Sequence, residues 1–138
     1  MRSYAFLVVM VYVLLFSFAT QAEEKVSPVS VAGAQTIDAA KAKSLFDSGV
    51  IFVDVRSDKD WDAGRVPDAV HLELHHNFDE GKLAGVVAKD KDVVFYCNGE
   101  HCLRSSEAAE QAVGWGWNKV HYFRDGFPAW KAAGYPAE

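Results

Sequence analysis

The clearest hydrophobic segments of the chain are short, almost continuously apolar and rich in β-branched residues. Beyond residue 22, residues 50–56 and 93–96 contain the strongest runs, and shorter ones occur at residues 70–72 and 120–123. A nearly continuous apolar run suits a strand buried on both faces, as in a parallel sheet that is covered by helices. The pattern therefore predicts four buried strands.

Segments that favour helices lie between these strands. Thr36 or Asp38 can cap a short helix through Phe46 that Gly49 closes, and residues 107–113 and 129–133 contain good helix formers followed by glycine. Strands that alternate with helices over this length predict a small α/β domain with a parallel sheet.

The first 22 residues have the pattern of a targeting segment. Arg2 supplies a positive charge, residues 5–18 are apolar and uncharged, and residues 19–22 include small side chains suited to cleavage. This apolar run is shorter than the ~20 residues that span a membrane. We expect a cleaved signal peptide at residues 1–22, with an uncleaved anchor as the alternative. Cleavage would make the protein periplasmic or secreted, with no stable membrane contact.

The remaining chain divides at about residue 36. Residues 23–35 contain charges, Pro and Gly without a sustained period, so we interpret them as a linker before a domain at residues 36–138. The net charge of −5 makes nucleic acid a poor partner for the surface as a whole.

Cys97 is the candidate nucleophile because it ends a predicted strand and begins a polar loop. If the loop curls over the start of the next helix, its N–H groups and the helix dipole favour a thiolate. Gly99, His101 and Arg104 add flexibility and positive charge. The structural alternative is that Cys97 is a small buried hydrophobic residue.

Three histidines raise the question of a metal site. His71, His75 and His76 lie close together in the sequence, but no cysteine or carboxylate completes a ligand set at a suitable spacing. We therefore expect no metal.

Three ordered blocks of sequence resemble the rhodanese-like domains. The similarity runs from about residue 36 to residue 136, and its blocks are Asp54-Val55-Arg56 with Gly64-Arg65-Val66-Pro67, Tyr96-Cys97 with Arg104-Ser105-Ser106, and Asp125-Gly126-Phe127-Pro128 with Trp130. The resemblance implies a five-stranded parallel sheet flanked by helices. It also implies an active-site loop that begins at Cys97.

The activity implied by this resemblance is sulfur transfer without a cofactor. The Cys97 thiolate would take a sulfane sulfur from a small anionic donor such as thiosulfate, and pass it to a thiol or cyanide acceptor. Arg104 would orient the donor. The substrate-binding residues would be those between Cys97 and Arg104, namely Asn98, Gly99, Glu100, His101, Cys102 and Leu103.

The loop departs from the family in its length and its second cysteine. Six residues separate Cys97 from Arg104, whereas the common sulfurtransferase loop has four and the related phosphatases have five. Cys102 is a candidate resolving cysteine, and we predict a reversible, inactive Cys97–Cys102 disulfide that a periplasmic reductant opens. The alternative is that Cys102 stays reduced and packs the loop. Two other functions stay open: a thiol–disulfide redox protein and a non-catalytic binding module.

Overall fold

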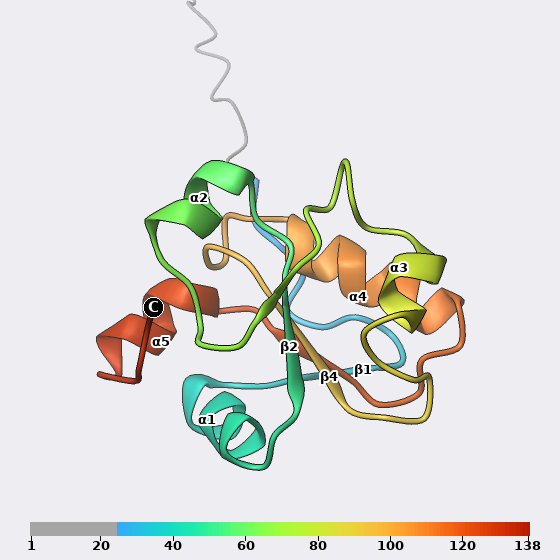
Figure 1. Ribbon diagram of the computed structural model, residues 1–138, viewed down its shortest axis with the longest axis horizontal. Helices are drawn as coiled ribbons and strands as arrows, with labels where there is room; N and C mark the ends of the chain where they lie inside the picture. The colour runs from blue at the N-terminus through green and yellow to red at the C-terminus, as the bar shows by residue number, and fades with distance from the viewer. Residues whose placement is uncertain (1–24) are drawn as a thin grey trace, which may run out of the picture.

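The computed structural model of the protein describes residues 25–138 (Figure 1). The predicted signal peptide at residues 1–22 lies outside this part of the chain. Within it, five strands form one parallel sheet in the order β1-β5-β4-β2-β3. The strands are β1 (Ala34–Thr36), β2 (Ile51–Asp54), β3 (Val70–His71), β4 (Val93–Tyr96) and β5 (Val120–Phe123). The predicted five-stranded parallel α/β fold is confirmed.

We interpreted residues 23–35 as a linker, but the described part of this segment contributes to the folded domain. Residues 34–35 belong to β1, which pairs with β5 at the edge of the sheet, and Ser27 and Val31 are buried. An edge strand is bonded on one side only, and β1 is short and largely exposed. It therefore lacks the apolar run that reveals the other strands.

Helices connect the strands, and two of them begin earlier than the sequence predicts. The helices are α1 (Ala39–Asp47), α2 (Asp58–Ala63), α3 (Glu80–Ala84), α4 (Arg104–Gly114) and α5 (Gly126–Ala132). Asp38 caps α1 through a hydrogen bond that its side chain accepts from the Lys41 N–H. The early start of α4 shortens the loop after β4, because Arg104 already belongs to the helix.

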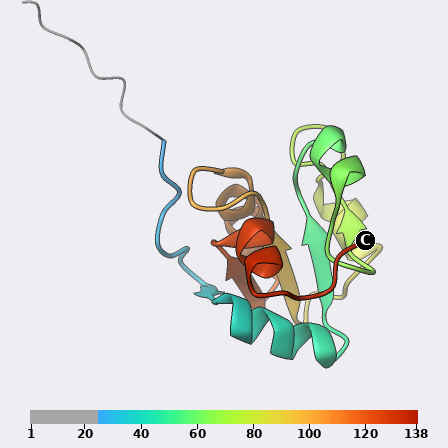
Figure 2. The same ribbon diagram turned by 90° about the vertical axis from the view of Figure 1, so that its left-hand side faces the viewer.

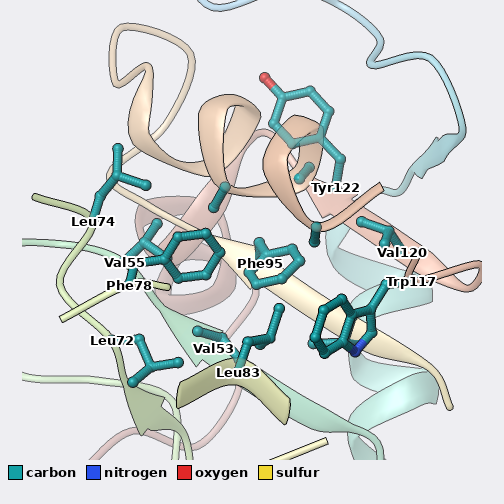
Figure 3. Packing of buried hydrophobic residues seen from close by; sticks show 14 of the residues in the cluster. Val53, Val55, Leu72, Leu74, Phe78, Leu83, Phe95, Trp117, Val120 and Tyr122 are labelled. Atoms are coloured by element: carbon teal, nitrogen blue, oxygen red, sulfur yellow. The ribbon is translucent and has the colours of Figure 1, made fainter. Parts of the chain in front are cut away.

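The sheet lies between two layers of helices. Figure 1 shows α1 and α5 to the left of β2 and β4, and α3 and α4 to their right. The cluster on the α3 and α4 side includes Phe95, Leu83 and Trp117 (Figure 3). The opposite cluster includes Tyr96 from β4 together with Phe127 and Trp130 from α5. Successive residues of β4 therefore face opposite layers, and this alternation turns Cys97 toward α4.

Over residues 25–138, none of the helices is long and apolar enough to cross a membrane. The carboxyl ends of β2 and β4 lie side by side, with Asp54 opposite Tyr96. Cys97 and the residues after Asp54 therefore meet at one edge of the sheet, the position where parallel α/β folds place their sites.

Candidate active site

Cys97 lies at the end of β4 and is completely buried. Its carbonyl accepts a hydrogen bond of 2.9 Å from the N–H of Phe127, in the first turn of α5. Its side chain packs in the cluster that contains Ala108 and Ala109 of α4. The backbone of the candidate nucleophile is thus held by one helix and its side chain is covered by another.

Gly126 makes the close approach of α5 to Cys97 possible. Its φ of +63° lies in the left-handed region. A Cβ atom at this position would lie 2.3 Å from the carbonyl oxygen of Cys97. Glycine is therefore required here for its conformation and for its missing side chain.

A tight turn after Cys97 brings the second cysteine back to it. The carbonyl of Gly99, a residue with a φ of +111°, accepts a 3.0 Å hydrogen bond from the N–H of Cys102. Cys97 and Cys102 form a disulfide, with their Cα atoms 6.2 Å apart. The predicted pairing of these cysteines is present, while its reversibility and its effect on activity stay predictions.

The other predicted substrate-binding residues have separate surroundings. Asn98, Glu100 and His101 are exposed, and Leu103 is half-buried as the N-cap of α4. Glu100 lies 3.4 Å from His101 and 3.7 Å from Arg124, measured from its carboxylate oxygens to their side-chain nitrogens. The loop therefore presents polar side chains to solvent.

Arg104 binds a buried carboxylate instead of extending toward solvent. Its Nη1 pairs with Glu73 and also donates to the carbonyl of Val55 at 3.3 Å. Burial alone would raise the pKa of Glu73, but hydrogen bonds from Arg104 and the His75 N–H outweigh it, so that pKa lies below its usual range. Arg104 thus fastens the start of α4 to the ends of neighbouring strands.

Arg56, which is not among the predicted site residues, forms a second charged network that includes the predicted residue Asn98. It is 3% exposed and forms a two-pronged ion pair with Asp54 through its Nε and Nη2 atoms. Its Nη1 donates to Asn98 at 3.2 Å, and Asn98 donates to Asp60 at 2.8 Å. This network links the end of β2 to the first residue of the loop.

The network also determines the ionisation of its members. Burial alone would lower the pKa of Arg56, but Asp54 outweighs that effect and raises it. The hydrogen bond from Asn98 lowers the pKa of Asp60 against the opposing effect of partial burial. The signal for this network was the Asp54-Val55-Arg56 sequence directly after a buried strand, where charge at a sheet edge needs a partner.

The described N-terminal segment lies against the loop (Figure 2). The N–H of Ser27 donates to the carbonyl of Glu100 at 2.7 Å, and Arg124 donates to the carbonyl of Ser27 at 3.0 Å. His101 lies 3.3 Å from the carbonyl of Lys25, measured from its Nδ1. Sequence reasoning missed this contact because backbone hydrogen bonds leave no mark in side-chain pattern.

A small cavity of about 180 Å³ lies beside the loop, between α2 and α5. Its lining includes Arg56, Asp60, Asn98, Phe127 and Lys131. Within residues 25–138, no group of three or more His, Cys, Asp or Glu side chains is placed to hold a metal ion. The chemistry available at this edge of the sheet is that of the cysteine pair and the polar groups around it.

Comparison with known proteins agrees with this geometry. The family model described as the rhodanese-like domain matches residues 38–133. The chain belongs to the rhodanese-like domain family. The match covers all of the sheet except β1, and it includes both cysteines and both charged networks.

Relatives within the rhodanese-like family include named enzymes. A thiosulfate sulfurtransferase from Pseudomonas savastanoi is 35% identical over 101 residues, covering 71% of this chain and 87% of the relative. A protein of unknown function from Rhodopseudomonas palustris, named a possible tyrosine phosphatase, is 32% identical with a TM-score of 0.62, over 76% of this chain and 85% of that one. A Bacillus halodurans protein shares the fold, with a TM-score of 0.67 at 22% identity over 76% of this chain and 77% of that one.

Proposed function

We propose that the protein is a sulfurtransferase in which Cys97 carries the sulfane sulfur. The Cys97 thiolate attacks the outer sulfur of thiosulfate, sulfite leaves with the electron pair of the broken S–S bond, and Cys97 becomes a persulfide. A thiol or cyanide acceptor then removes the outer sulfur. The observation that carries this proposal is the place of Cys97, at the end of β4 and followed by a loop that leads into α4.

The start of α4 supports a thiolate at this position. The helix has 11 residues, and its N-cap, Leu103, makes no side-chain cap hydrogen bond in the described structure. The N–H groups of a first helical turn have no partners within the helix, and the helix dipole favours negative charge there. The start of α4 therefore favours the thiolate form of reduced Cys97.

The loop's backbone, more than Arg104, is the proposed binding element for the donor. Glu73 neutralises much of the charge on Arg104, and Arg56 is neutralised in the same way by Asp54. Apart from Cys102, whose N–H donates to Gly99, the N–H groups of residues 98–104 offer partial positive charge without such a partner carboxylate. Arg104 is thus a positioning residue, which holds the loop in the shape that exposes its amides to the donor.

The disulfide favours one second candidate, a thiol–disulfide redox protein. Cys97 and Cys102 are already bonded, so sulfur transfer requires prior reduction by a thiol.

We propose that activity depends on a reductant in the compartment that contains the protein, which we take to be the periplasm or the exterior. Finding the intact chain, residues 1–22 included, in the cytoplasmic fraction would contradict export.

Mass spectrometry separates the candidate functions. Reduced protein, freed of reductant, is mixed with thiosulfate without oxygen, and sulfite is assayed in parallel. We expect sulfite release from wild type and Cys102→Ser, and a mass gain of one sulfur in Cys102→Ser. Cys97→Ser should show neither. The absence of sulfite from all of these proteins would overturn the proposed sulfur transfer, and disulfide exchange without sulfite would favour the redox protein.

A further inference from the structure

Cys102 stands where a second chemical step can follow the formation of the persulfide. Its Cα lies 6.2 Å from that of Cys97, within the roughly 4.4–6.8 Å that disulfides span. The two sulfur atoms are bonded in the structure. The fold therefore allows Cys102 to reach the inner sulfur of a Cys97 persulfide, which is the original Sγ of Cys97.

Backbone contacts hold both cysteines in this relation. Phe127 fixes the carbonyl of Cys97 at 2.9 Å, and Gly99 fixes the N–H of Cys102 at 3.0 Å. Ser27 donates to the carbonyl of Glu100, in the middle of the turn, at 2.7 Å. Groups held in reacting geometry lose little further entropy when they react, so an internal thiol competes well with one from solution.

The two cysteines also differ in their access to solvent. Cys97 is completely buried, whereas Cys102 is only partly buried. A thiol that approaches the disulfide from solution therefore meets Cys102 first. Attack on the sulfur of Cys102 would release Cys97 as the thiolate, next to the start of α4 where negative charge is favoured.

We propose that Cys102 resolves the Cys97 persulfide and releases hydrosulfide, which makes the protein a thiol-dependent thiosulfate reductase. The proposal rests on the persulfide chemistry proposed above. The Cys102 thiolate attacks the Sγ of Cys97, the bond between that Sγ and the outer sulfur breaks, and the outer sulfur leaves as hydrosulfide. The product is the Cys97–Cys102 disulfide.

The cycle closes with an external dithiol of the disulfide-reductase class. This dithiol reduces the protein disulfide to two thiols and is itself oxidised to a disulfide. In the complete reaction, thiosulfate accepts two electrons from the dithiol and is split into sulfite and hydrosulfide. The disulfide in the structure is then an intermediate of turnover as well as a product of oxidation.

A single turnover without an external thiol tests this step. Reduced, desalted protein is mixed with thiosulfate in the absence of oxygen, and sulfite, sulfide and protein mass are measured together. Wild type should release one equivalent each of sulfite and sulfide, and should end two hydrogens lighter than reduced protein. Cys102→Ser should release sulfite, no sulfide, and keep the extra sulfur. Cys102→Ala provides a second variant should the serine hydroxyl disturb the loop.

The outcomes separate the two proposals. Release of sulfite by wild type, with a stable persulfide and a free Cys102 thiol, would overturn resolution while leaving sulfur transfer intact. Equal sulfide release from wild type and Cys102→Ser would also overturn it. The first-order rate constant for sulfide release by wild type should not depend on protein concentration. A rate constant that rises with protein concentration would show attack between molecules and would contradict the internal step. Failure to release sulfite in any variant would instead remove the sulfur transfer itself.

Discussion

Two neighbouring strand ends at the same edge of the sheet have opposite properties. After β2, the charged groups of Asp54 and Arg56 are buried and satisfied by each other and by Asn98. After β4, the turn from Gly99 to Cys102 exposes the side chains of Glu100 and His101, and it is held by backbone hydrogen bonds and by the Cys97–Cys102 disulfide. Under the proposed function, charge at a sheet edge does not by itself mark the reacting groups, because the charged groups at the end of β2 are already paired with each other.

The physical reason lies in the cost of burying charge. A buried ion pair that loses one partner leaves an uncompensated charge, so its members are tied to a structural role. The two cysteines are not part of a buried ion pair, so they can exchange covalent bonds while the surrounding backbone stays in place. This difference supports the proposal that the reaction takes place at the loop after β4.

The largest expected effect on activity comes from the loop. Cys97→Ser should reduce sulfite release from thiosulfate to the background rate, because the serine hydroxyl is not a nucleophile of comparable strength. Its free energy of unfolding should be compared with that of reduced wild type by urea denaturation. Retention of thiosulfate cleavage by a folded Cys97→Ser protein would move the reacting group elsewhere.

The largest expected effect on stability comes from the end of β2. Arg56→Ala should lower the free energy of unfolding by about 3–5 kcal/mol, since it leaves the Asp54 carboxylate buried without its partner. Urea denaturation at neutral pH measures the change. The double variant Asp54→Asn with Arg56→Ala is the control, and it should be less destabilised than expected from the sum of the two single changes.

Gly126→Ala tests the contact between α5 and Cys97. The left-handed conformation alone costs an alanine roughly 1–2 kcal/mol, and the clash with the Cys97 carbonyl should add to this cost and reduce activity. Gly49→Ala is a matched control, because Gly49 has a φ of +82° with nothing within 4 Å of its added Cβ. Equal losses of stability and activity in the two variants would show that the close approach of α5 to Cys97 contributes to neither property.

Acid should weaken the contact between α4 and Glu73. The lowered pKa of Glu73 means that its contribution to stability is present above its unfolded pKa of about 4.3, and is lost as the pH falls through its lower folded pKa. Asp60 contributes with the same sign. Glu73→Gln should therefore reduce the dependence of unfolding free energy on pH below about 4.3. The exposed residue Glu110 on α4 offers Glu110→Gln as a control, and an equal reduction in both variants would contradict the assignment.

The smallest signal is expected with phosphate esters. A phosphatase loop directs its arginine at the phosphate, whereas six residues separate Arg104 from Cys97 and Arg104 pairs with Glu73. We expect an aryl phosphate to be hydrolysed no faster by reduced wild type than by Cys97→Ser. Turnover that disappears in Cys97→Ser would show that the longer loop still accepts phosphate.

The sequence by itself determined the parts of this protein that depend on local composition. Continuous apolar runs predicted β2 and β4 because strands buried on both faces need apolar side chains at every position. The position of Cys97 after such a run placed it at the carboxyl edge of the sheet. The pairing of Cys97 with Cys102 was also predictable, because a short loop that contains glycine limits how far apart they can lie.

The tertiary structure decided which charged groups pair and which segments cover the loop. Arg104 meets Glu73, 31 residues away, and Asn98 joins the Arg56 network over 42 residues. Their separation in sequence carries no periodic signal, since the partners come together only when parallel strands are placed side by side. The docking of Ser27 on Glu100 likewise uses backbone groups that every residue has. Local pattern therefore located the candidate nucleophile, while long-range packing paired Arg104 with Glu73.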